Sequence, residues 1–499
     1  MIKQIILAVC ALMAGLIGVI LLRTFTYGGA PQNIREISLP EAPAIDHEHA
    51  VQNLSQAIQF RTITLQAGDP RPGQAGPWLD MQAWMETTYP RFHAMAQKET
   101  VPDGYKLLFT WQGSENNLDP LLLMAHQDVV PVNMGTQDDW DAPPFSGAVT
   151  DGYIYGRGAL DDKGSMIGLL EALEALAVSG FRPQRTIYLM LGHDEEVSGS
   201  GARRGVALLK SRGVRPVMAL DEGFMAIENN PLTGSTLAFI GVAEKGYVTL
   251  QITASAQGGH SSTPPRNSAT IRLAKALLAL ENHQMPADLS KAPVSTLFET
   301  AAPQMPFTQR LVFANQWLFG GLINARMSHI PAANAMIRST TAPTMLSGSS
   351  KENVLAQRAT AVINFRIHPN DSEDKIIAHV KRVTSDIDGL SITLGRSGIR
   401  GTGASHVSPM DNLSYGVLYA VAAETSRAPV TPGLVLGATD ARYASAITEN
   451  VYRFMPAVMS PEDLTGFHGT NERLSVENVG RLAKGYAQII LAMDIHREE

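Results

Sequence analysis

Three short apolar runs in the first half of the sequence each end at charged or imidazole side chains. The runs and the groups that follow them are Pro120–Met124 with His126 and Asp128, Thr186–Leu191 with Gly192–Glu196, and Val217–Leu220 with Asp221–Gly223. Burying such groups is costly unless a partner compensates them. Open α/β sheets place their ligand sites at the carboxyl ends of strands, so the runs predict a sheet with a polar site along one edge.

The segments between these runs have helical spacing. Apolar residues recur at helical intervals through Lys163–Ser179, Gly180 stands at its end, and Arg203–Arg212 is a second predicted helix. Strands that alternate with helices are joined by right-handed crossovers. The expected fold class is therefore α/β, with a mixed, mostly parallel sheet and flanking helices.

A region of different character interrupts this pattern. Lys245–Ala254 and Thr360–Pro369 alternate in the manner of antiparallel strands, and α/β character returns after Gly403 and continues to a final helix at Ser475–Met493. We expect a catalytic domain in two parts, residues 44–243 and 404–499, and an inserted α+β lid or dimerisation domain at residues 244–403.

The chain begins with an apolar segment. Ile5–Leu22 contains no charged residue, and as a helix it would span about 27 Å, close to the ~30 Å hydrocarbon core of a bilayer. We predict a membrane anchor at residues 1–23 and a linker at residues 24–43, with a cleaved signal peptide as the alternative. The catalytic domain is then expected to be extracytoplasmic, periplasmic or lumenal, or secreted if the segment is removed.

Composition limits the classes of partner and metal site. The net charge of −7 argues against nucleic acid as a partner. Cys10 is the single cysteine and lies in the apolar segment, which excludes an intrachain disulfide and a zinc site built on cysteine. Any metal here must be bound by His, Asp and Glu.

Two further motifs complete a candidate metal site. "YGRGALDDKGS" supplies Asp161 before a predicted helix, and "GFHGTNERL" supplies His468. Crowded carboxylates repel one another unless cations lie between them. Nitrogen and oxygen ligands suit zinc, with cobalt or manganese as substitutes. The candidate ligands, which fit two ions that share one carboxylate, are His126, Asp161, Glu196, Asp221 and His468.

Six motifs together resemble one enzyme family. They are "AHQDVVP", "GRGALDDKGS", "GHDEEVSG", "ALDEG", "GGHSS" and "GFHGTNE", in that order. The sequence from Glu48 onward resembles the dizinc metallopeptidase and amidohydrolase family of aminoacylase, carboxypeptidase S and succinyl-diaminopimelate desuccinylase. The apolar start, the loop "WDAPPFSG" and the large middle region resemble most its branch with carboxypeptidase S and N-fatty-acyl-amino-acid synthase/hydrolase.

The resemblance implies a role for each polar residue of the site. Asp161 would bridge two zinc ions, with His126 and Asp221 at one ion and Glu196 and His468 at the other. Asp128 would accept a hydrogen bond from the far nitrogen of His126, and the Asp161–Asp162 peptide would be cis. Glu195 would be the general base, facing away from its neighbour Glu196 because adjacent side chains of an extended chain point in opposite directions.

The resemblance also implies groups that bind the substrate. His260 in "GGHSS" would stabilise the oxyanion, within one chain or from the partner of a homodimer formed through the lid domain. Arg366 would hold a substrate carboxylate with its planar fork. Asn334 would lie nearby, as would Gly437, although the family's usual Gly-Gly-Thr-Asp is Gly-Ala-Thr-Asp here.

These roles imply a metal-dependent hydrolase that cleaves the amide bond of N-acyl amino acids or small peptides with a free carboxylate. The alternative is a membrane-tethered binding protein with a degenerate metal site, which would lack a ligand or the base. Six apolar side chains of the middle region either line a groove for an acyl group or belong to the core or a dimer surface. They are Phe298, Phe307, Phe313, Trp317, Leu318 and Phe319.

Overall fold

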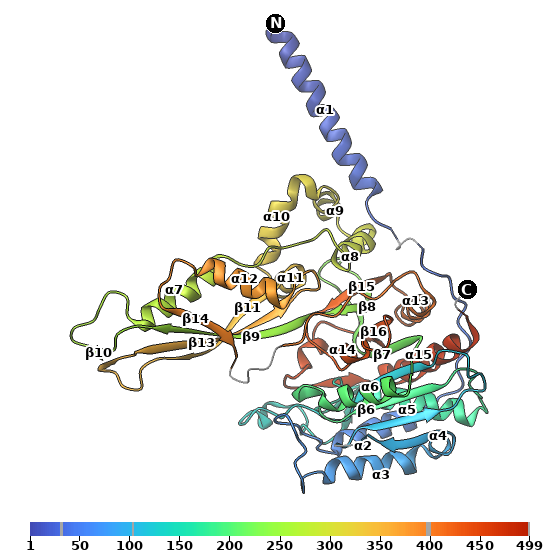
Figure 1. Ribbon diagram of the computed structural model, residues 1–499. Coiled ribbons are helices and arrows are strands. Elements are labelled where there is room, and N and C mark those ends of the chain that lie inside the picture. The colour runs from blue at the N-terminus through green and yellow to red at the C-terminus, as the bar shows by residue number, and fades with distance from the viewer. Residues whose placement is uncertain (30–32, 102–103, 396–400, 498–499) are drawn as a thin grey trace.

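The computed structural model describes residues 1–29, 33–101, 104–395 and 401–497. Its centre is an eight-stranded mixed sheet (Figure 1). In spatial order the strands are β1 (Gln97–Thr100), β2 (Leu107–Trp111), β6 (Ile187–Gly192), β3 (Leu121–His126), β7 (Met218–Ile227), β16 (Val451–Met459), β8 (Leu237–Glu244) and β15 (Val430–Val435). The four strands β6, β3, β7 and β16 run parallel to one another, as predicted.

Alternate residues of β3 pack against two different helical layers. Leu121 and Leu123 belong to the larger core, while Leu122 and Met124 face the smaller one. The larger core is covered by α2 (His47–Gln59), α3 (Gly76–Thr88), α4 (Pro90–Met95), α5 (Lys163–Val178), α13 (Leu413–Ser426) and α15 (Val476–Ile495), and the smaller core by α6 (Ser200–Ser211) and α14 (Ala441–Ala444). With both faces covered, polar side chains of this sheet are grouped at the strand ends.

The inserted region forms a second sheet with its own core. It contains β11 (Thr340–Ser347), β13 (Arg358–Ile367), β9 (Gly246–Ser255) and β14 (Leu390–Leu394), covered by α7 (Ala269–Asn282) and α12 (Glu373–Val383). β9 and β13 pair antiparallel over ten residues, and their side chains alternate between buried and partly exposed, which is the periodicity that predicted them. The pair β10 (Gly259–His260) and β12 (Val354–Leu355) lies at the far tip of this region (Figure 1).

Four short helices of the same region pack on the central sheet instead of the second one. They are α8 (Val294–Ala301), α9 (Phe307–Ala314), α10 (Gln316–Ser328) and α11 (Pro331–Ile337). Their buried residues form a core with Leu237 and Phe239 of β8. Phe298 is buried there and stacks on Phe313, with ring centroids 4.3 Å apart. For Phe298 the acyl-groove hypothesis was therefore wrong and the core alternative holds. The domain boundaries at 243/244 and 403/404 stay a prediction.

The N-terminal helix α1 (Ile2–Thr26) projects from the body (Figure 1). Among the described residues it is the helix long and apolar enough to cross a membrane, and a signal sequence would meet the same criteria. The helix runs three residues past the predicted segment, and residues 30–32 of the predicted linker lie outside the described part of the chain.

Candidate active site

Four side chains meet at the carboxyl edge of the parallel strands. His126 is the last residue of β3, and Asp161 lies just before α5. Glu196 lies in a short 3-10 helix after β6 (Glu195–Val197), and His468 lies in a loop near the end of the chain. The structure thus brings together residues up to 342 positions apart in sequence, of which His126, Asp161 and Glu196 could hold one metal ion.

Asp161 occupies the middle of this group. One carboxylate oxygen is 2.9 Å from Nε2 of His126 and the other is 2.9 Å from Nε2 of His468. His468 Nε2 is also 3.1 Å from Glu196. A carboxylate with one oxygen toward each of two imidazoles would suit a ligand shared by two metal ions. The Asp161–Asp162 peptide bond is cis, as the family resemblance implied.

Asp221 was predicted to bind the same ion as His126 and Asp161, but the neighbouring Glu222 is a second candidate for this position. The Glu222 carboxylate is 3.6 Å from Nε2 of His126, and His126, Asp162 and Glu222 form a second buried group able to hold a metal ion. Asp221 is buried beside them, accepts the N–H of Glu222 and has its other carboxylate oxygen without a hydrogen-bond partner in the described structure. Asp221 stays a prediction, and the geometry favours Glu222.

The charges of the cluster fit bound cations. Burial opposes the charged imidazole of His126, but hydrogen bonds to Asp128, Asp161 and Glu222 outweigh it and raise its pKa well above the usual value. Hydrogen bonds to Asp161 and Glu196 raise the pKa of His468 to about 10. Burial and the nearby Asp161 raise the pKa of Glu222 to about 8. Charged imidazoles thus compensate carboxylates of the cluster, and divalent cations would replace the imidazole protons.

Asp128 orients two parts of the site. Nδ1 of His126 is 3.0 Å from the backbone carbonyl of Asp128 and 3.5 Å from its carboxylate, so the carbonyl is the nearer acceptor. The carboxylate accepts the N–H groups of Glu195 and Glu196 at 3.1 and 3.2 Å and the hydroxyl of Thr64 at 2.8 Å. Asp128 therefore positions the turn that carries the predicted base, in addition to its expected role beside His126.

Glu195 and Glu196 have a backbone conformation that differs from the predicted one. They lie in a 3-10 helix, so the extended conformation assumed from the sequence was wrong. Burial, followed by repulsion from Asp440, raises the pKa of Glu195 well above its ordinary value. A carboxylate with a raised pKa is suited to accept a proton near neutral pH.

Glu472 was not predicted and fixes the loop that carries Asp161. Its Oε1 accepts the backbone N–H groups of Gly158, Leu160 and Asp161 at 2.9, 2.9 and 3.2 Å. Its Oε2 forms a buried ion pair with Arg157 at 2.5 Å. Glu472 follows His468 by four residues in "HGTNE", so the motif that gave the ligand also contained this signal.

The predicted substrate-binding residues gather around Lys245. Its buried Nζ donates to the carbonyls of Ala335, which follows Asn334 within α11, and of Arg338, which follows this helix. Burial and the nearby Arg366 lower the pKa of Lys245 to about 7. The Lys245 N–H donates to Val435, where the loop with Gly437 begins. A side chain at Gly437 would meet open space, so packing does not require glycine there.

His260 lies apart from these groups. It is exposed in β10 at the tip of the second sheet (Figure 1). The N–H of Ser262 donates to its Nδ1 at 3.1 Å, so Nδ1 accepts and the proton of the neutral ring is on Nε2. His260 therefore presents a hydrogen-bond donor, but it does not join the metal-ligand cluster of the same chain.

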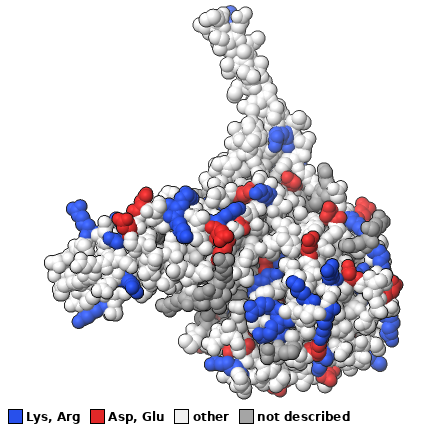
Figure 2. Space-filling model, viewed as in Figure 1, with Lys and Arg blue, Asp and Glu red and all other residues white. Residues whose placement is uncertain are grey.

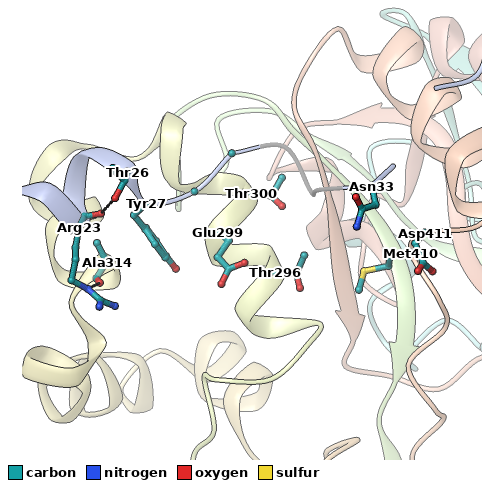
Figure 3. Close-up of a pocket in the computed structure, with 12 residues that line it drawn as sticks. Arg23, Thr26, Tyr27, Asn33, Thr296, Glu299, Thr300, Ala314, Met410 and Asp411 are labelled. Carbon is teal, nitrogen blue, oxygen red and sulfur yellow. Dashed lines mark hydrogen bonds between the residues drawn. The ribbon is translucent and has the colours of Figure 1, made fainter. Parts of the chain in front are cut away.

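A cavity of about 840 Å³ lies at the foot of α1, away from the cluster (Figure 3). Arg23 and Tyr27 of the N-terminal segment, Glu299 of α8 and Asp411 line parts of it. None of the predicted catalytic residues lines this cavity.

Comparison with known proteins identifies enzymes of similar sequence. The chain is 36% identical to the N-fatty-acyl-amino acid synthase/hydrolase of Xenopus tropicalis over 487 residues, covering 96% of this chain and 93% of that protein. It is 30% identical to carboxypeptidase S of Saccharomyces cerevisiae over 481 residues, covering 86% and 81%.

Solved structures share the fold. Human carnosine dipeptidase 1 matches with a TM-score of 0.62 at 16% identity, covering 90% of this chain and 96% of that one. The M20 family metallo-carboxypeptidase Sso-CP2 of Sulfolobus solfataricus gives the same TM-score and identity and covers 90% and 99%. Residues 122–492 match the model of peptidase family M20/M25/M40, and the chain belongs to this family of metal-dependent hydrolases.

Proposed function

We propose that this protein uses two zinc ions to hydrolyse the amide bond of N-acyl amino acids or small peptides that carry a free carboxylate. The observation that supports this most is the Asp161 carboxylate, which lies between two imidazoles with one oxygen toward each. The residues that would hold the ions are His126, Asp161, Glu196, His468 and either Asp221 or Glu222. Cobalt and manganese are chemically acceptable substitutes for zinc.

The proposed chemistry uses the base beside the ligands. Bound divalent ions supply a water of lowered pKa and a Lewis acid for the scissile carbonyl. Glu195 takes the proton of the attacking water and delivers it to the leaving amine. The backbone N–H groups of Glu195 and Glu196 donate hydrogen bonds to the Asp128 carboxylate. These bonds fix the backbone from which the Glu195 side chain extends.

A cationic region would hold the substrate carboxylate. Arg366 is exposed on β13, with its guanidinium 6.0 Å from the ring of Tyr247, and Asn334 has a buried side-chain oxygen without a partner in the described structure. Both lie beside Lys245. The two named relatives act on acyl-amino acids and on peptides by their names, which supports this substrate class and leaves the preferred acyl group open.

We also propose that α1 is retained as a membrane anchor and that the catalytic body lies on the extracytoplasmic side. The apolar run and its exposure along nearly the whole helix support retention. A protein secreted after removal of α1 is the alternative, which N-terminal sequencing of the mature protein would identify.

The catalytic proposal is tested by Glu195→Gln. Removing a general base typically lowers the rate by about 10²–10⁴-fold, so we expect kcat to fall by this factor while the metal content is unchanged. Turnover of a panel of N-acyl amino acids and dipeptides is measured together with elemental analysis of the same sample. Glu477→Gln, an exposed carboxylate at the start of α15, is the matched control. Near-normal turnover by Glu195→Gln would refute the assignment.

A further inference from the structure

We propose that the outer face of α9 and α10 docks on the surface of the lipid bilayer that holds α1. The proposal rests on the anchoring role of α1 and is independent of the catalytic assignment. The lipid-facing surface consists of Phe307 on α9 and Trp317, Leu318 and Leu322 on α10.

These four side chains form an exposed apolar surface. Trp317 and Leu322 are 56% and 62% exposed, and Phe307 and Leu318 are exposed to a similar degree. Leu318 and Leu322 are four residues apart and therefore lie on one face of α10, with Trp317 beside them. Contiguous exposed apolar side chains on a folded protein usually mark a surface of interaction.

Contacts with α1 fix the position that this surface takes relative to the bilayer. Asn315, between α9 and α10, donates to the Ile20 carbonyl and to the Thr24 hydroxyl, both at 3.3 Å. Arg310 donates to the carbonyls of Phe25 and Tyr27, and Phe25 contacts the ring of Phe307. Ile20 lies within the uncharged run that ends at Leu22. Anchoring α1 in a bilayer therefore brings the α9–α10 corner to the membrane boundary.

The arrangement of the whole molecule agrees with this placement. α9 and α10 lie at the edge of the body from which α1 projects (Figure 1). The projecting α1 carries little charge in Figure 2, and its sequence has only Lys3 and Arg23 as charged residues.

The charge of the helical segment also favours lipid as the partner. No Asp or Glu occurs between Glu299 and Glu352, whereas Arg310 lies on α9 and the exposed Arg326 on α10. Basic and uncharged surfaces suit anionic headgroups, and tryptophan is enriched at the boundary between headgroups and acyl chains. A bilayer surface therefore matches both the apolar side chains and the sign of the charge around them.

Fluorescence of the full chain in phosphatidylcholine vesicles tests the docking. The emission of wild-type protein minus that of Trp317→Phe isolates Trp317. We expect lipids brominated near the headgroup to quench roughly half or more of this component, as is typical of a residue at the interface, and aqueous iodide to quench it little. Trp84 on α3 is partly exposed at the opposite end of the body, so the same subtraction with Trp84→Phe is the matched control and should show the reverse pattern.

Each other outcome overturns the proposal in a recognisable way. Quenching of Trp317 by iodide and not by brominated lipid would place the surface in water. Protection from both quenchers would indicate a protein partner, such as a second copy of this chain. Failure of the protein to float with the vesicles would reject the anchor itself, whereas the Glu195→Gln experiment would be unaffected.

Discussion

Asp221 and Glu222 are adjacent on β7 and have different surroundings. The Glu222 carboxylate is 3.6 Å from Nε2 of His126, whereas Asp221 accepts the N–H of Glu222 and is influenced by the charges of His126 and Arg453. Burial raises the pKa of Asp221 to about 6. Two neighbouring carboxylates thus compete for one ligand position, and their variants form a matched pair.

We expect Glu222→Gln to lose about one equivalent of metal and Asp221→Asn to keep both, because a neutral amide binds zinc far less well than a carboxylate. Elemental analysis of the two purified variants is the measurement. Loss of the ion from Asp221→Asn alone would restore the ligand predicted from the sequence.

Four of the proposed metal ligands could be predicted from the sequence as single residues. His126, Asp161, Glu196 and His468 were predicted and lie together. The preference for Glu222 could not be predicted, because the register of β7 against β3 decides which side chain reaches His126. The sequence also could not predict that the backbone carbonyl of Asp128, rather than its carboxylate, is the acceptor nearer to His126, because this depends on the local backbone geometry.

The loop that precedes α5 shows how one element depends on another far away in sequence. The Glu472 carboxylate satisfies three N–H groups of this loop together with Arg157. Without it, Arg157 would be a buried charge with no carboxylate partner. Removing one member of such a pair usually costs about 3–5 kcal/mol.

We expect Glu472→Ala to lower the unfolding free energy by about that amount and to weaken metal binding by about 10–100-fold, as loss of a group that orients ligands does. Chelator competition and chemical denaturation are the measurements. Glu472→Gln keeps an oxygen acceptor and should lose less. Wild-type metal affinity in Glu472→Ala would show that the loop is held by other contacts.

Whether a segment is a helix or a strand was easier to predict than which other element it packs against. The strands β9 and β13 and the helix α15 begin and end within one or two residues of their predicted limits, because periodicity and the Ser475 cap are local signals. The packing of α8–α11 on β8 was not predicted, since apolar helices of the middle region carry no information about which sheet they cover. The 3-10 turn at Glu195 was missed because so short a charged segment has no periodicity that separates it from extended chain.

The distance of His260 from the metal ligands concerns the whole molecule. His260 lies at the tip of the second sheet, with Nε2 as a donor. A residue placed there can act on the site of a partner subunit in a symmetric dimer. The homodimer therefore stays a prediction that has a direct catalytic consequence.

We expect His260→Ala to lower kcat by about 10²–10³-fold without metal loss, as removal of an oxyanion donor does. Mixing it with Glu195→Ala should restore at most about a quarter of wild-type activity, since about half of random dimers are mixed and each has one complete site. The measurement is turnover before and after subunit exchange. No recovery on mixing would favour action within one chain.

The place of β16 between β7 and β8 determines when the protein can finish folding. β7 and β8 are made early, but the strand that fills the space between them begins at Val451, more than two hundred residues later. During synthesis the edges of β7 and β8 that β16 later occupies are unpaired, apart from a short β7–β8 contact, while the whole inserted region is translated. Such edges attract other chains, so newly made protein should need shielding by chaperones until its last fifth emerges from the ribosome.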